Sequence, residues 1–221
     1  MTAVPRDRIT SGDGEGGAVG NKRLWQQVEW IWEEYLRCDR LGYLGEVTRE
    51  EPALLTPDDV DRSLLERAIQ AGDLAAVQCL IELGARVCVP ATGGYTYLHT
   101  ALESDRFQPA IVQALLDAGA NPSQVGIRGF TALHHAAVHG RAEVLGAMLE
   151  RGADINLRTY IDGEWTPLMV AAIRGQSETI RQLLTLGADA SLRDRDGRTA
   201  ADIAQQHGHS KLAQLLASHR S

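Results

Sequence analysis

A short phrase that begins with threonine recurs along the chain at a nearly fixed spacing. Its four copies are Thr96-Tyr-Leu-His, Thr131-Ala-Leu-His, Thr166-Pro-Leu-Met and Thr199-Ala-Ala-Asp. The threonines are separated by 35, 35 and 33 residues, and a Gly-Ala phrase keeps a similar step at Gly84, Gly119, Gly152 and Gly187. Such a period is typical of repeat proteins, in which each unit buries its apolar surface against its neighbours. The sequence therefore predicts an elongated stack of similar units.

The two central copies extend into longer matching stretches. They read Gly129-Phe-Thr-Ala-Leu-His-His-Ala-Ala and Gly163-Glu-Trp-Thr-Pro-Leu-Met-Val-Ala-Ala. The final copy has Asp202 where the first two copies have histidine. In these features the chain from Leu64 to about Leu216 resembles the ankyrin repeat family. The resemblance implies an all-α, L-shaped solenoid of helix pairs, with a concave face made of hairpin tips and inner helices. It also implies a protein-binding module with no activity of its own.

The repeat domain is expected to occupy residues 56–221. Ser63 precedes Gly84 by 21 residues, as Thr131 precedes Gly152, so Ser63 takes the place of the repeat threonine in a degenerate first unit. A helix is expected to begin at Thr56-Pro57, a typical helix start, and to run into this segment. The five expected repeats are about 56–90, 91–122, 123–156, 157–191 and 192–221.

The residues before the repeats are expected to form a tail and a cap. Residues 1–20 are glycine-rich, which predicts a disordered tail. Residues 21–55 are predicted to form a helical cap over the apolar end of the stack. Its apolar positions recur at helical spacing and are Leu24, Val28, Ile31, Trp32, Tyr35 and Leu36. Trp30 lies among the polar positions, and it either packs against the following loop, at 41–55, or is exposed for a partner.

Two units depart from the regular spacing. The distance from Thr96 to Gly119 is two residues longer than the usual 21, which predicts an enlarged interhelix turn at 104–109. The hairpin at 157–162 has one extra residue, near Tyr160. Insertions in repeat proteins fall in loops on one face, which is often the binding face.

The resemblance also gives the candidate partner-binding residues. In the family, the residue before the repeat threonine points into the concave face, and the inner helix supplies a second variable zone. The position before the repeat threonine is occupied by Tyr95, Phe130, Trp165 and Arg198. The variable zone of the inner helix gives Val138, His139, Ile173 and Arg174. An apolar patch with a polar rim marks an interaction site, and Trp, Tyr and Arg are frequent at binding hot spots. The alternative is that the aromatic side chains only pack on the neighbouring hairpin.

The sequence gives no catalytic, cofactor or metal site. His99 and His134 are expected to join neighbouring repeats by hydrogen bonds. His135 and His139 are spaced i, i+4, so both can reach one metal ion, but no third ligand is evident at a sensible spacing. The sequence motifs of nucleotide-binding loops, serine hydrolases and zinc proteases are absent. We therefore expect neither a metal nor a cofactor.

Composition limits the partners and the compartment. The net charge is −7, residues 29–59 alone carry −6, and no basic stripe exists to follow a nucleic acid. No apolar run reaches the roughly 18 residues of a membrane span. Three cysteines and the absence of a secretory signal favour the cytoplasm, with delivery through a specialised secretion system as an alternative.

These observations favour a non-catalytic, monomeric module that binds another protein through its concave face. The role would be that of an adaptor, an inhibitor or a toxin-neutralising protein. One alternative is a scaffold that self-associates through Trp30 or the aromatic row. Another is a metal-dependent or catalytic module in residues 21–60, although that segment has no histidine, no serine and no recognisable carboxylate pair.

Overall fold

The computed structural model describes residues 28–36, 40–50, 63–88, 95–126, 129–160 and 163–219. A helix at 28–36 begins the described part. The elements that follow it are α2 (Arg40–Glu50), α3 (Leu64–Ala71), α4 (Leu74–Glu82), α5 (Tyr97–Glu103), α6 (Pro109–Asp117), α7 (Ala132–His139), the 3-10 helix η5 (Ala142–Val144), α8 (Leu145–Glu150), α9 (Pro167–Arg174), α10 (Ser177–Thr185), α11 (Ala200–Gln206) and α12 (Ser210–Ser218). Among these residues, β-pairing is limited to an isolated bridge between Arg193 and Thr199. The expected all-α fold is confirmed.

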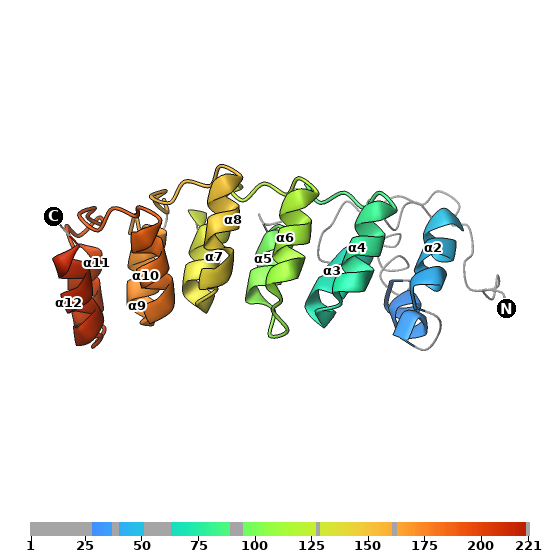
Figure 1. The fold of residues 1–221 in the computed structure, drawn as a ribbon, viewed down its shortest axis with the longest axis horizontal. Helices are drawn as coiled ribbons and strands as arrows, with labels where there is room; N and C mark the ends of the chain where they lie inside the picture. The colour runs from blue at the N-terminus through green and yellow to red at the C-terminus, as the bar shows by residue number, and fades with distance from the viewer. Residues whose placement is uncertain are drawn as a thin grey trace, which may run out of the picture.

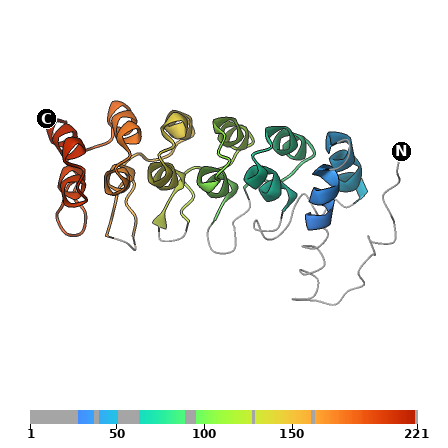
Figure 2. The ribbon, with the colours of Figure 1, turned by 90° about the horizontal axis from the view of Figure 1, so that it is seen from below.

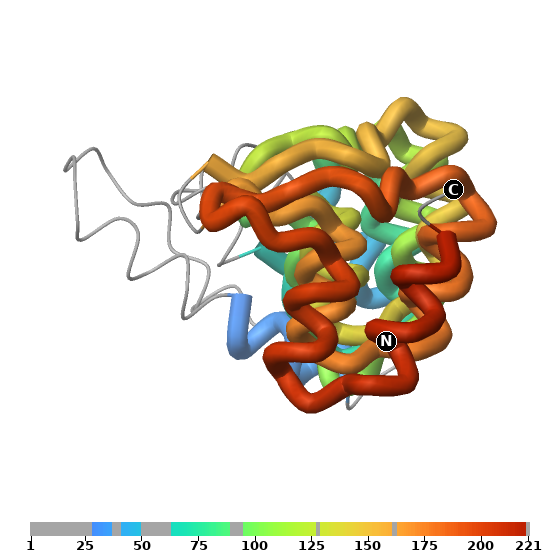
Figure 3. The backbone as a smooth tube through the Cα atoms, turned by 90° about the vertical axis from the view of Figure 1, so that its left-hand side faces the viewer, coloured from blue at the N-terminus to red at the C-terminus, as the bar shows by residue number. Residues whose placement is uncertain are grey.

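The helix pairs stand side by side in two rows (Figures 1 and 2). The inner row is α3, α5, α7, α9 and α11, and each of these helices packs against the next. The outer row is α4, α6, α8, α10 and α12, and the loops between successive pairs project beyond the inner row. Seen along the stack, successive pairs lie behind one another (Figure 3). The surface formed by the inner helices and these hairpin loops is called the inner face below.

The recurring threonine is the residue that starts each inner helix. Thr166 has an extended backbone, and its hydroxyl accepts a hydrogen bond from the Met169 amide at 3.3 Å. Ser63 does the same for Glu66 at 2.9 Å, which confirms that it takes the place of the repeat threonine. Such caps satisfy amides that have no partner within the helix. Because Ser63 is extended, the helix expected from Thr56 does not run through it, and that prediction is wrong at this point.

Hydrogen bonds also join each repeat to the one before it. In each case the residue before an outer helix donates a hydrogen bond from its side chain. The acceptor is a carbonyl at the end of the inner helix of the previous repeat, where that carbonyl has no partner within its own helix. These bonds run from Gln108 to Gly72, from Arg141 to Leu102, from Gln176 to Val138 and from His209 to Ile173. The spacing of the repeats is therefore fixed by polar contacts as well as by packing.

The core runs through the whole stack between the two rows. The paired alanines of α7 and α9, Ala136 with Ala137 and Ala171 with Ala172, are fully buried. Their small side chains let neighbouring inner helices approach closely. Leucines from both rows fill the space between them, including Leu115 of α6 and Leu183 of α10. The glycine that follows each of α4, α6, α8 and α10 has a positive φ, between 86° and 98°, as the Gly-Ala phrase predicts.

The N-terminal cap is a pair of helices, which corrects the expectation of one helix followed by a loop. Residues 40–50 form α2, and α2 packs against α4 of the first repeat. The helix at 28–36 is tied to the same repeat by the Tyr35 hydroxyl, which donates to Asp73 at 2.9 Å, and by an ion pair between Glu29 and Arg67. Trp30 is half-buried and packs against the core. The cap thus continues the two rows of the stack.

Some expectations lie outside the described residues. These are the tail at 1–20, the start of the cap helix near Asn21, and Thr56-Pro57. The enlarged turn of the second repeat is confirmed, because residues 104–108 separate α5 from α6 whereas Gly140 and Arg141 alone separate α7 from η5. In the described part of the chain, no helix has the length and apolar character needed to cross a membrane.

Candidate functional site

The eight residues predicted to bind a partner are accessible to different degrees on the inner face. Arg174 is exposed, and the other seven are half-buried. The aromatic and aliphatic members pack with one side against the core and leave the rest of the side chain in solvent; they are Tyr95, Phe130, Val138, Trp165 and Ile173. The packing of these side chains agrees with the second interpretation. Their binding to a partner stays a prediction.

Tyr95 and Phe130 do not stand in a simple row but surround His135. The ring centroids of Tyr95 and His135 are 6.1 Å apart, and those of Phe130 and His135 are 5.7 Å apart, both edge-to-face. His99 lies still closer to His135, at 4.5 Å. Phe130 also stacks on His134 at 5.3 Å. The second and third repeats therefore share one cluster of aromatic and imidazole rings.

Trp165 lies back on its own hairpin. A Cβ placed on Gly163 would lie 3.1 Å from the Trp165 indole nitrogen, so the ring covers the glycine backbone closely. The Trp165 amide donates to the Thr159 hydroxyl at 3.0 Å, and its carbonyl accepts from the Thr159 amide at 2.9 Å. Trp165 is therefore a rigid part of the hairpin. The exposed part of its side chain is an apolar surface beside α9, separate from the ring cluster around His135.

Tyr160 is an accessible aromatic residue that the sequence analysis did not place among the binding residues. Its side chain is the most exposed large apolar group of the described residues, at 68%. The ring lies over the backbone of the preceding hairpin, since a Cβ on Gly129 would approach it to 2.8 Å. The one-residue insertion in this hairpin was the signal that pointed to it. Tyr160 is thus a fourth aromatic residue of this face, after Tyr95, Phe130 and Trp165, and it lies over Gly129, the residue before Phe130.

Arg198 forms its polar contacts mainly within its own hairpin. Its guanidinium donates to the buried Asp194 carboxylate at 2.7 and 2.9 Å and pairs with Asp196 at 2.9 Å. The hydrogen bonds to Asp194 raise the pKa of Arg198 further above its usual value. The positive charge of Arg198 is thus largely neutralised by carboxylates of the fifth repeat. The candidate surface therefore consists of the other seven predicted residues and Tyr160.

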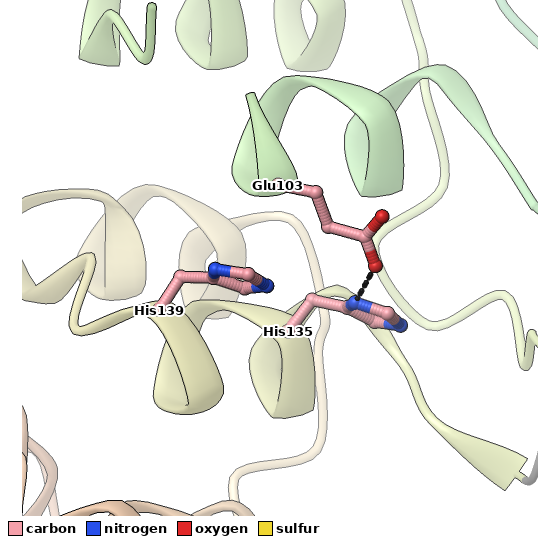
Figure 4. Close-up of side chains that lie close together, drawn as sticks. All are labelled: Glu103, His135 and His139. Atoms are coloured by element: carbon pink, nitrogen blue, oxygen red, sulfur yellow. Dashed lines mark ion pairs between the residues drawn. The ribbon is translucent and has the colours of Figure 1, made fainter. Parts of the chain in front are cut away.

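Three potential metal ligands lie close together where α5 meets α7 (Figure 4). Glu103 ends α5, and His135 and His139 stand one turn apart on α7. One ligand atom of each side chain lies within 4.8 Å of the other two, and Glu103 Oε1 is 2.8 Å from His135 Nδ1. The sequence analysis found no third partner for the two histidines, and the structure supplies Glu103 from the preceding repeat. The pairing depends on how α5 and α7 stack, which residue spacing alone does not show.

The environment of this cluster favours a carboxylate beside neutral imidazole. The hydrogen bond with His135 lowers the pKa of Glu103. Burial lowers the pKa of His139, against the opposing effect of Glu103. At neutral pH the cluster therefore presents a negative oxygen ligand and an unprotonated nitrogen ligand.

Glu103 also borders an open groove between α3 and α5. The groove has a volume of about 550 Å³. Its lining is mostly polar and consists of Glu66, Gln70, Tyr95, Thr100, Glu103, Ser104, Asp105 and Arg106. Three carboxylates against one guanidinium make this part of the inner face acidic.

The chain matches a family model described as ankyrin repeats (3 copies) over residues 65–159 and 160–221. The matched residues take in the helix pairs from α3 to α12 and leave out the N-terminal cap. No curated protein matches the chain.

Proposed function

Because the chain belongs to the ankyrin repeat family, whose members generally mediate protein–protein interactions, we propose that it binds a partner protein through its inner face. The observation that carries this proposal is the group of half-buried apolar side chains at the hairpins and inner helices of the third and fourth repeats. Phe130, Val138, Trp165 and Ile173 are held by the core yet remain partly open to solvent. Such groups lose little conformational freedom when they bind.

The charges around these side chains indicate the kind of segment that fits. The groove beside Tyr95 carries the carboxylates of Glu66, Glu103 and Asp105. An apolar surface lies further along the stack, on α7, α9 and their hairpins. A partner segment with basic residues at one end and a large apolar residue at the other would complement both. As a non-catalytic binder, the protein would act as an adaptor, an inhibitor or a toxin-neutralising protein.

The proposal predicts that partner affinity depends on the inner face and is independent of the outer helices. The partner is first captured from the protein's own cells on the immobilised full chain and identified by mass spectrometry. Trp165→Ala is then expected to weaken binding by about 30-fold, because a buried aromatic hot spot contributes ~2 kcal/mol or more. Tyr160→Ala and Arg174→Ala change exposed side chains, and each is expected to weaken binding less.

The matched control is a pair of exposed residues on the outer helix of the same repeat. Glu178 and Arg181 of α10 form an exposed ion pair at 3.4 Å, and replacing both with alanine is expected to leave affinity unchanged. Affinity is measured by calorimetry, and circular dichroism verifies that each variant is folded. A folded Phe130→Ala, Trp165→Ala double variant that retains full affinity would exclude the inner face as the binding site.

A further inference from the structure

We propose that Glu103, His135 and His139 form a binding site for a divalent transition-metal ion, Zn²⁺ foremost, at the junction of the second and third repeats. Two imidazole nitrogens and one carboxylate oxygen are a ligand set that Zn²⁺ takes in proteins. Three protein ligands leave at least one coordination position for water or for a group from another molecule. The site shares His139 with the predicted partner-binding residues and Glu103 with the acidic groove. Metal binding is measured on the chain alone, so it is tested independently of the partner.

The present geometry is close to what a metal ion requires. Ligand atoms around a tetrahedral Zn²⁺ lie about 3.3 Å apart, given bond lengths of roughly 2.0–2.2 Å. The three ligand atoms here lie within 4.8 Å of one another, and the Glu103–His135 pair is already at 2.8 Å. Closing the remaining gap needs small rotations of the Glu103 and His139 side chains, which are both half-buried rather than locked in the core. An ion bound by both side chains would replace the contact between Glu103 Oε1 and His135 Nδ1.

Neighbouring side chains enclose the His135 ligand, whereas the Glu103 ligand is accessible to solvent. The His135 ring is enclosed by Tyr95, His99 and Phe130, and its side chain is only 11% exposed. The Glu103 side chain is 35% exposed, so an ion can enter from solvent. A rigid nitrogen ligand with an accessible carboxylate resembles the arrangement of an open metal site more than that of a closed structural one.

The nearby charges do not all favour a cation. The positive charges of Arg141 and Arg174 act on His139 and help to lower its pKa. The guanidinium of Arg141, however, donates to the carbonyls of Leu102 and Ser104 and lies 4.2 Å from the centre of the Phe107 ring. Its position is thus fixed by contacts of its own, and the carboxylate of Glu103 provides the compensating negative charge.

Metal binding at this place would link two repeats, because Glu103 belongs to α5 and both histidines to α7. An ion that binds the folded chain and not the unfolded one stabilises the fold, and the stabilisation grows with the logarithm of the ion concentration above the dissociation constant. The stack has no covalent link between these helices among the described residues. The ion would therefore act as a cross-link within the inner row.

The test is a titration of the full chain, without a histidine tag and freed of metal by a chelator, with ZnCl₂ and separately with CoCl₂. Calorimetry is expected to show one Zn²⁺ per chain. At a Zn²⁺ concentration one hundred times the dissociation constant, the melting temperature is expected to rise by about 5–10 °C. Co²⁺ is expected to give the visible absorption of a four- or five-coordinate ion with nitrogen and oxygen ligands.

Variants decide where the ion binds. Glu103→Gln and His139→Ala each remove one ligand from a half-buried position, and each is expected to weaken Zn²⁺ binding by about tenfold or more. His207→Ala, at an exposed position after α11, is the matched control and is expected to leave the affinity unchanged. The proposal is overturned if millimolar Zn²⁺ produces neither heat nor a shift in melting temperature. It is equally overturned if both ligand variants bind Zn²⁺ as the unmodified chain does.

Discussion

His134 uses both ring nitrogens for hydrogen bonds, and the two bonds reach different repeats. Its Nδ1 accepts from the Thr131 amide at 3.2 Å, and its Nε2 donates to the Trp165 carbonyl of the next hairpin at 3.1 Å. The ring is fully buried, and this burial lowers its pKa to about 4. A protonated ring would lose the bond from Thr131, since Nδ1 would then carry a hydrogen. This single neutral side chain therefore caps one helix and positions the hairpin that carries Trp165.

The lowered pKa predicts a loss of stability on mild acidification. The unfolded chain binds a proton at His134 near pH 6.5, whereas the folded chain does so only near pH 4. Between these values the unfolded state holds more protons, so the free energy of unfolding falls as the pH falls. From pH 7.5 to pH 5 the contribution of His134 is expected to decline by on the order of 2 kcal/mol. Urea unfolding at intervals across this range measures it.

His134→Asn separates this effect from the titration of the carboxylates. The last repeat has Asp202 at the equivalent position, and its carboxylate accepts from the Thr199 amide at 2.9 Å, so a short side chain can still cap the helix. The variant is expected to be less stable than the unmodified chain at pH 7.5, with the difference shrinking toward pH 5. If the two proteins lose stability in parallel, His134 is not the group that titrates.

At the scale of the elements, the cap is a helix pair that completes the stack. Val28, Ile31 and Tyr35 of the first helix and Leu44 and Val47 of α2 are buried. Without them, the apolar faces of α3 and α4 would be open to water at the end of the array. Terminal units with a polar outer side are a general requirement for solubility in repeat proteins.

Removal of residues 1–55 is therefore expected to cause aggregation or a loss of cooperative unfolding. The melting curve followed by circular dichroism should broaden, and light scattering should show large species. Removal of residues 1–20 alone is the matched control and should leave the curve unchanged, because the sequence predicts no core residue there. A monomer that still melts cooperatively after loss of residues 1–55 would show that the first repeat needs no cap.

The elements that could be predicted from the sequence are those whose ends are set by residues close to them in the chain. The threonine that caps an inner helix and the glycine that ends an outer one act through neighbouring amides and carbonyls, so Thr131 and Gly152 predict structure directly. Helix α2 was missed because Gly42 and Gly45 disfavour a helix, and its stability comes from packing against α4. Glu103 was missed as a ligand because its approach to His135 follows from the stacking of two repeats.

At the scale of the whole molecule, the candidate partner-binding residues lie along one side of the stack. Within the inner row each helix packs against the helices before and after it, so the hairpins follow one another along the stack. The acidic groove beside α3 and α5 and the apolar surface beside α7 and α9 follow one another along this side. The outer helices present exposed polar residues such as Gln113 and Arg181. This difference between the two sides is the basis of the proposed function.

Site-specific photo-crosslinking in the protein's own cells tests this claim most directly. Benzoylphenylalanine is placed at one of four exposed positions: Tyr160 and Arg174 on the inner face, or Gln113 and Arg181 on the outer helices. Since a crosslink forms only with a group in contact, the account predicts that the same partner protein is joined at Tyr160 and Arg174. It predicts no crosslink to that partner at Gln113 or Arg181. Crosslinks to the partner from the outer positions, with none from Tyr160 or Arg174, would contradict the account.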